Sequence, residues 1–144
     1  MEYKTIQRIE THIVREGQSN FKFTCPLDSV KYMQELQNSD IEKVIAVYLN
    51  SQNEVICESV ISIGSIGYSA LSLRDIVKIA LLVGATGVIL LHNHPAGSLQ
   101  ASNEDKKITQ RIQQCFELFE IKLIDHIIVT ATNHFSFADK QLLV

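Results

Sequence analysis

Three features are missing from this 144-residue sequence, and each absence narrows its class. No apolar run approaches the roughly 18 residues that a membrane span needs. The first residues, Met1 to Lys4, lack the basic and apolar regions of a signal peptide. The three cysteines are odd in number and form no C-x-x-C pair, so they predict reduced thiols and no disulfide framework. Together these absences predict a cytoplasmic protein without a membrane anchor.

Dense runs of lysine and arginine are also missing, and the formal net charge is −3. This balance argues against tight, stand-alone binding to a phosphate backbone. Internal repeats, low-complexity tracts and linkers are absent as well. The sequence therefore predicts one domain over residues 1–144, long enough to bury roughly 68–70% of its unfolded surface.

Hydrophobic periodicity predicts alternating strands and helices. The expected strands are 41–49, 55–63, 87–91, 121–130 and 135–137, with an edge strand or hairpin within 1–24. The expected helices are 26–38, 72–83 and 102–119, the last with Ile108, Ile112, Cys115 and Phe119 on its core face. Residues 64–69 are expected to form a loop. This pattern predicts an α/β (α+β) fold with a mixed sheet flanked by helices.

One stretch carries a constellation suited to metal chemistry. His92 and His94 lie two residues apart at the end of the strand expected over 87–91, so their side chains leave it on one face. Pro95 and Gly97 then turn the chain, and Ser102 opens a helix with Asp105 in its first turn. Two imidazoles, one carboxylate and a position for water form the ligand set of a catalytic zinc site.

More ordinary interpretations exist for the same residues. The histidines could be core or capping residues, and S-x-x-D is also a helix-start pattern. The spacing favours ligation by His92, His94 and Asp105 of Zn²⁺. A nucleobase deaminase is excluded, because its H-x-E and P-C-x-x-C signature is absent. Asp125-His126 is expected to make an internal hydrogen bond rather than to bind metal.

The spacing of these residues resembles the JAMM motif of MPN (JAB) domain metalloproteases. The wording His92-Asn93-His94-Pro95-x-Gly97 resembles the RadC branch of that family, as do the stretches 123–129 and 135–139. The resemblance implies an MPN core over about 22–144 with a fold similar to cytidine deaminase. It also implies a short form without the helix–hairpin–helix segment of longer members, and an association with DNA repair and its partners.

The resemblance further implies a catalytic pair. Ser102 would contact the reacting water or stabilise the oxyanion. A glutamate on an earlier strand would be the general base, and Glu58 is the candidate. Aligned on Gly64, Glu58 stands one residue early, which on a strand reverses the face of its side chain. A β-bulge between Ser59 and Ile63 would restore its aim.

The leading hypothesis is a zinc metallopeptidase that cleaves an amide or isopeptide bond in a peptide or protein substrate. A non-catalytic metal-binding or protein/DNA-interaction module is the first alternative, and the one-residue offset of Glu58 supports it. A metal-dependent nuclease is the second, and the net negative charge disfavours it.

Overall fold

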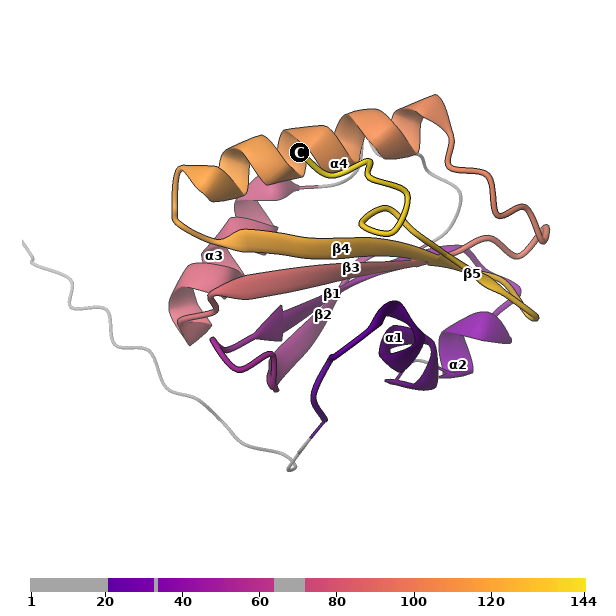
Figure 1. Ribbon diagram of the computed structural model, residues 1–144, viewed down its shortest axis with the longest axis horizontal. Coiled ribbons are helices and arrows are strands. Elements are labelled where there is room, and N and C mark those ends of the chain that lie inside the picture. The colour runs from indigo at the N-terminus through magenta and orange to yellow at the C-terminus, as the bar shows by residue number, and fades with distance from the viewer. Residues whose placement is uncertain (1–20, 33, 64–71) are drawn as a thin grey trace, which may run out of the picture.

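A single five-stranded sheet organises the chain (Figure 1). The computed structural model describes residues 21–32, 34–63 and 72–144. Its elements in chain order are α1 (Pro26–Tyr32), α2 (Gln34–Gln37), β1 (Lys43–Leu49), β2 (Val55–Ile63), α3 (Leu73–Val83), β3 (Gly87–Asn93), α4 (Asn103–Glu117), β4 (Lys122–Val129) and β5 (His134–Ser136). The strand order is β2-β1-β3-β4-β5. The α/β fold expected from the sequence is confirmed.

The sheet is mixed because one of its four pairings is parallel. β1 pairs antiparallel with both β2 and β3, and β5 pairs antiparallel with β4. β3 and β4 are parallel, and α4 forms the crossover between them. β3 lies at the centre, and every residue from Gly87 to Asn93 is buried. The site residues at the end of β3 therefore belong to the central strand, which is paired on both sides and buried along its whole length.

Helices cover both faces of the sheet, α3 and α4 on one side and α1 and α2 on the other (Figure 1). Alternate residues of β3 enter the two resulting cores, because successive strand side chains point to opposite faces. Val88 and Leu90 pack with α3 and α4, whereas Ile89 and Leu91 pack with residues of α1 and α2. By the same alternation His92 belongs to the α4 face and Asn93 to the α1–α2 face.

Some expected boundaries differ from the structure. The helix expected over 26–38 is divided into α1 and α2, with residue 33 outside the described residues. The prediction that Phe119 lies on the core face of the helix over 102–119 is wrong. Helix α4 ends at Glu117, and Phe119 is 45% exposed. The chain turns at Glu120, which has a φ of 57°, and Ile121 enters the core instead.

Two expected segments fall outside the described residues: most of the N-terminal strand or hairpin, and the loop over 64–69. The end of the N-terminal segment is described, and Lys22 there forms an antiparallel bridge with Glu54. Among the described helices, none combines the length and apolarity required to cross a bilayer.

Candidate metal centre

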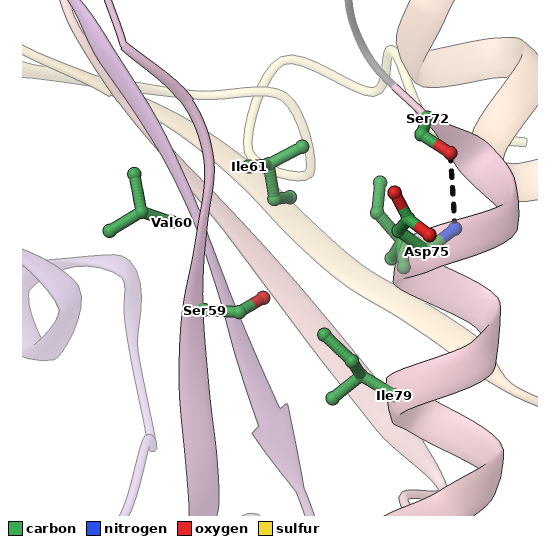
Figure 2. Close-up of a pocket in the computed structure, with 7 residues that line it drawn as sticks. Ser59, Val60, Ile61, Ser72, Asp75 and Ile79 are labelled. Carbon is green, nitrogen blue, oxygen red and sulfur yellow. Dashed lines mark hydrogen bonds between the residues drawn. The ribbon is translucent and has the colours of Figure 1, made fainter.

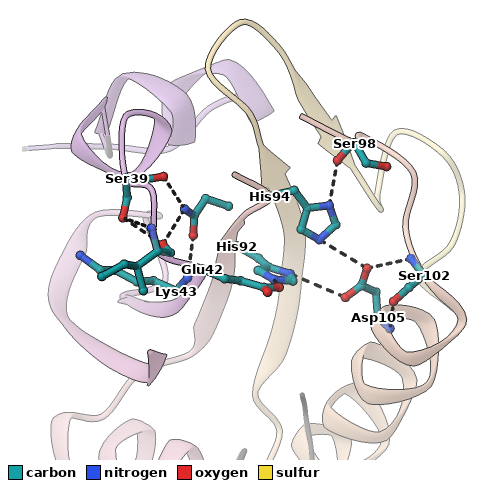
Figure 3. Close-up of polar contacts among 10 residues, drawn as sticks. Ser39, Glu42, Lys43, His92, His94, Ser98, Ser102 and Asp105 are labelled. Carbon is teal, nitrogen blue, oxygen red and sulfur yellow. Dashed lines mark hydrogen bonds and ion pairs between the residues drawn. The ribbon is translucent and has the colours of Figure 1, made fainter. Parts of the chain in front are cut away.

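Two histidines meet where β3 ends (Figure 3). His92 is 2% exposed, and its ring centroid lies 4.6 Å from that of His94, with the two rings nearly perpendicular. His94 follows the last residue of β3, and its backbone N–H donates to the carbonyl of Val129 on β4. The strand expected from the sequence therefore places both imidazoles at the C-terminal end of β3.

A capping box at the start of α4 places the third residue. The Ser102 hydroxyl oxygen accepts from the Asp105 backbone N–H at 3.0 Å, and Asp105 Oδ2 accepts from the Ser102 N–H at 2.7 Å. This reciprocal pair satisfies two backbone donors of the first helical turn. The Asp105 carboxylate, itself buried, also lies at the positive end of the helix dipole. Helix capping and proximity to the histidines thus occur together at Asp105.

Asp105 faces both imidazoles. Its Oδ1 lies 3.6 Å from Nδ1 of His92, and its Oδ2 lies 3.7 Å from Nε2 of His94. These separations are longer than hydrogen bonds. They are close to the roughly 3.3–3.5 Å expected between two ligand atoms of one tetrahedral zinc ion. The structure therefore brings His92, His94 and Asp105 together, as the spacing predicts.

The tautomer of His94 suits this arrangement. The Ser98 carbonyl can only accept, so Nδ1–H of His94 donates to it at 2.8 Å. Nε2 then carries the lone pair and points toward Asp105. A ligating histidine usually donates its other N–H to a carbonyl or carboxylate in this way.

Glu42 is the fourth member of the cluster, and sequence reasoning missed it. Its Oε1 makes a close contact with Nε2 of His92, and its side chain is 33% exposed. Glu42, His92 and His94 each offer one ligand atom, all within 4.8 Å of one another. The only feature of the sequence that could have indicated Glu42 is its position directly before a buried strand. Fifty residues separate Glu42 from His92, and the pairing of Val44 with His92 closes that gap.

Glu58 is not brought to this cluster. Its Oε2 accepts a hydrogen bond of 2.6 Å from the Tyr32 hydroxyl of α1, on the sheet face opposite to His92. Figure 2 shows its neighbour Ser59 directed toward α3, beside a pocket between β2 and α3, and Val60 directed away. By strand alternation Glu58 takes the same side as Val60.

β2 pairs with β1 through two register shifts, one on each side of Glu58. One shift lies between the pairs Ile45–Val60 and Val44–Ser62, within the predicted interval, and the other lies between Tyr48–Cys57 and Leu49–Val55. The shift within the predicted interval does not restore the aim of Glu58, whose carboxylate bonds to Tyr32 on the face opposite to His92. Burial, followed by the hydrogen bond to Glu58, raises the pKa of Tyr32, so the phenol remains a donor to this carboxylate at neutral pH.

Burial also sets the protonation state of the centre. It lowers the pKa of His92 below its ordinary value, against the opposing effects of Glu42 and Asp105. The His92 imidazole is therefore neutral at pH 7, which is the form that binds metal.

Asp125 and His126 support the centre from behind. Nδ1 of His126 lies 2.6 Å from the Thr109 hydroxyl, which donates to the Asp105 carbonyl at 2.6 Å. Asp125 accepts from Ser136 and from the backbone of Ala138. The internal hydrogen bonds expected for this pair are confirmed. Burial lowers the pKa of His126 to about 3, so its ring is neutral.

Replacing Ser102 by alanine is expected to lower the free energy of unfolding by about 1 kcal/mol, because the Asp105 N–H loses its acceptor. Urea denaturation of the metal-free protein measures this change. Ser102→Thr keeps the acceptor and should retain most of the stability. Equal losses in the two variants would contradict a capping role.

Comparison with known proteins finds relatives of this chain. Residues 23–142 match the model of the RadC-like JAB domain. The chain is 38% identical over 131 residues to a UPF0758 protein of Histophilus somni, covering 90% of this chain and 59% of the relative. It is 38% identical over 122 residues to one of Flavobacterium johnsoniae, covering 84% and 53%. The chain thus spans somewhat more than half the length of these curated relatives. The matched region contains Glu42, His92, His94 and Asp105.

Proposed function

This chain belongs to the RadC-like JAB domain family, and on that premise we propose that it is a zinc-dependent metallopeptidase. Its reaction is hydrolysis of an amide or isopeptide bond in a peptide or protein. The supporting observation is the convergence of two imidazoles and a buried carboxylate, with a second carboxylate beside them. The α/β sheet with its flanking helices is the JAB/MPN fold.

The donor set fits zinc. Two histidine nitrogens and one carboxylate oxygen are a common ligand set of catalytic Zn²⁺ sites, which keep a fourth position open. Asp105 is buried, and the capping box fixes its carboxylate 3.6 Å from Nδ1 of His92 and 3.7 Å from Nε2 of His94. We therefore assign His92, His94 and Asp105 as the residues that would hold the ion.

Two carboxylates compete for the role of ligand, because Glu42 also groups with the histidines. Their surroundings separate them. Asp105 is 2% exposed and held by the capping box, which suits a fixed ligand. The Glu42 side chain is 33% exposed and so is open to solvent and substrate, which suits a general base. We assign the base to Glu42 in place of Glu58.

The roles in hydrolysis follow from these positions. A bound Zn²⁺ supplies Lewis-acid activation of water and of the substrate carbonyl. Glu42 accepts the proton of the attacking water and returns it to the leaving amine. The Ser102 hydroxyl is exposed at the start of α4, and its hydrogen can donate to the developing oxyanion while its oxygen accepts from Asp105.

Zinc titration followed by turnover of peptide and isopeptide libraries tests this function. We expect one zinc per chain and zinc-dependent cleavage. His92→Ala should abolish stoichiometric binding and turnover together. His134→Ala, a histidine on β5, is the matched control and should retain both.

Different outcomes would select the other hypotheses. Zinc binding without cleavage of any amide would favour a non-catalytic module. Cleavage of DNA but not of peptides would favour a nuclease. Equal zinc binding by wild type and His92→Ala would contradict the proposed centre itself.

A further inference from the structure

Asn93, between the two histidines, has no part in the centre described so far. It is the last residue of β3 and is 2% exposed. By strand alternation its side chain takes the face opposite to His92. A buried amide has four hydrogen-bonding positions to satisfy, and an unsatisfied one costs free energy. The partners of this amide therefore indicate what Asn93 does.

All of those partners are backbone groups of one segment, residues 39–43. Oδ1 of Asn93 accepts from the Lys43 N–H at 2.7 Å. Its Nδ2 donates to the Ile41 carbonyl at 2.9 Å and to the Ser39 carbonyl at 3.3 Å. Figure 3 shows Ser39 and Lys43 of this segment on the side of His92 away from Asp105. One side chain thus takes the place of several ladder hydrogen bonds.

This segment carries Glu42. Ile41 and Lys43 are its two neighbours in the chain, so Asn93 holds the backbone on both sides of it. The regular pairing of β1 with β3 stops at Val44 and His92, two residues beyond Glu42. Residues 39–42 themselves lie outside any helix or strand. The amide of Asn93 therefore extends the attachment of β1 to β3 past the end of the ladder.

We propose that Asn93 is a positioning residue that aims the Glu42 carboxylate at the centre. The same three consecutive residues, His92-Asn93-His94, then supply two ligands on one face of the sheet and orient the general base from the other face. The catalytic part of this inference rests on the proposed function. The attachment of the segment to Asn93 does not.

Asn93→Ala and Asn93→Ser remove the amide without adding charge near the centre. Asn38→Ala is the matched control, because Asn38 lies on the same connection but is exposed, with one hydrogen bond of 3.5 Å to the Gln34 carbonyl. In the Asn93 variants, the Lys43 amide hydrogen should exchange at least about tenfold faster, since an opening that costs 1.4 kcal/mol less gives that factor. The ring ¹⁵N resonances of His92 should move as they do in Glu42→Gln. The control should change neither.

A double-mutant cycle separates positioning from general structural support. Asn93→Ala should lower kcat at least about tenfold in the wild-type background and leave zinc affinity nearly unchanged. In the Glu42→Gln background the same substitution should have almost no further effect, because the group it positions is gone. Equal losses in both backgrounds, or a parallel loss of zinc affinity, would overturn the proposal.

Two further results keep this inference distinct from the proposed function. If the wild type binds zinc but hydrolyses nothing, the function fails, while the exchange and resonance measurements still decide the attachment. If neither Asn93 variant folds, hydrogen exchange of the wild-type protein tests the attachment instead. We expect the Lys43 amide to exchange as slowly as the Ala46 amide within β1. Exchange at the rate of an exposed loop would overturn the proposal.

Discussion

Glu42→Gln will lower kcat for amide hydrolysis by about 10²–10⁴-fold, the range for loss of a general base. The glutamine keeps the size of the side chain and a contact with His92, but it cannot accept the proton of the attacking water. Zinc binding should persist, because His92, His94 and Asp105 are unchanged. Steady-state kinetics beside zinc titration measures both quantities. A loss of zinc affinity as large as the loss of kcat would instead identify Glu42 as a ligand.

Glu58→Gln is the matched control for this experiment. It is the same chemical change, made at the glutamate that the sequence pattern alone favours. Because the Glu58 carboxylate bonds to Tyr32 on the opposite face, kcat should stay near that of the wild type. If Glu58→Gln removed activity and Glu42→Gln did not, the assignment of the base would be reversed.

The metal-free protein will lose stability steeply as the pH falls from about 6.5. His126 is neutral in the folded protein down to its pKa of about 3, whereas an unfolded histidine binds a proton below about 6.5. The unfolded state therefore holds more protons between these values, and acidification favours it. The difference between these two pKa values corresponds to a loss on the order of 5 kcal/mol.

Neighbouring groups modify this dependence. His92 on β3 is also held neutral and adds to the loss, and His94 opposes a proton on His126 whereas Asp105 on α4 favours one. Burial raises the pKa of Asp125 above its ordinary value. The folded state therefore keeps the Asp125 proton above pH 3.8, and this offsets part of the stability that is lost at the lowest pH values.

Urea denaturation in EDTA at several pH values between 7 and 4 measures the effect. His126→Gln, which cannot titrate but can still bond to Thr109, should flatten the pH dependence. An identical slope in wild type and His126→Gln would show that other groups cause the acid instability.

The sequence by itself determined the parts of the centre that depend on local geometry. His92 and His94 share a face because strand side chains alternate with a period of two. Ser102 and Asp105 meet because a capping box joins the residues at its first and fourth positions. Each of these relations is contained within a single element or its end, so the spacing of the residues was enough to predict it.

Only the tertiary structure decided which glutamate joins the centre. Glu42 reaches His92 because β1 pairs with β3 in one register, and Asn93 attaches the segment that carries Glu42. Glu58 faces α1 because its register pairs it with Val47, which packs on the α1–α2 face of the sheet. Register is set by the burial of both faces of the sheet at once. No local pattern around Glu42 or Glu58 contains that information.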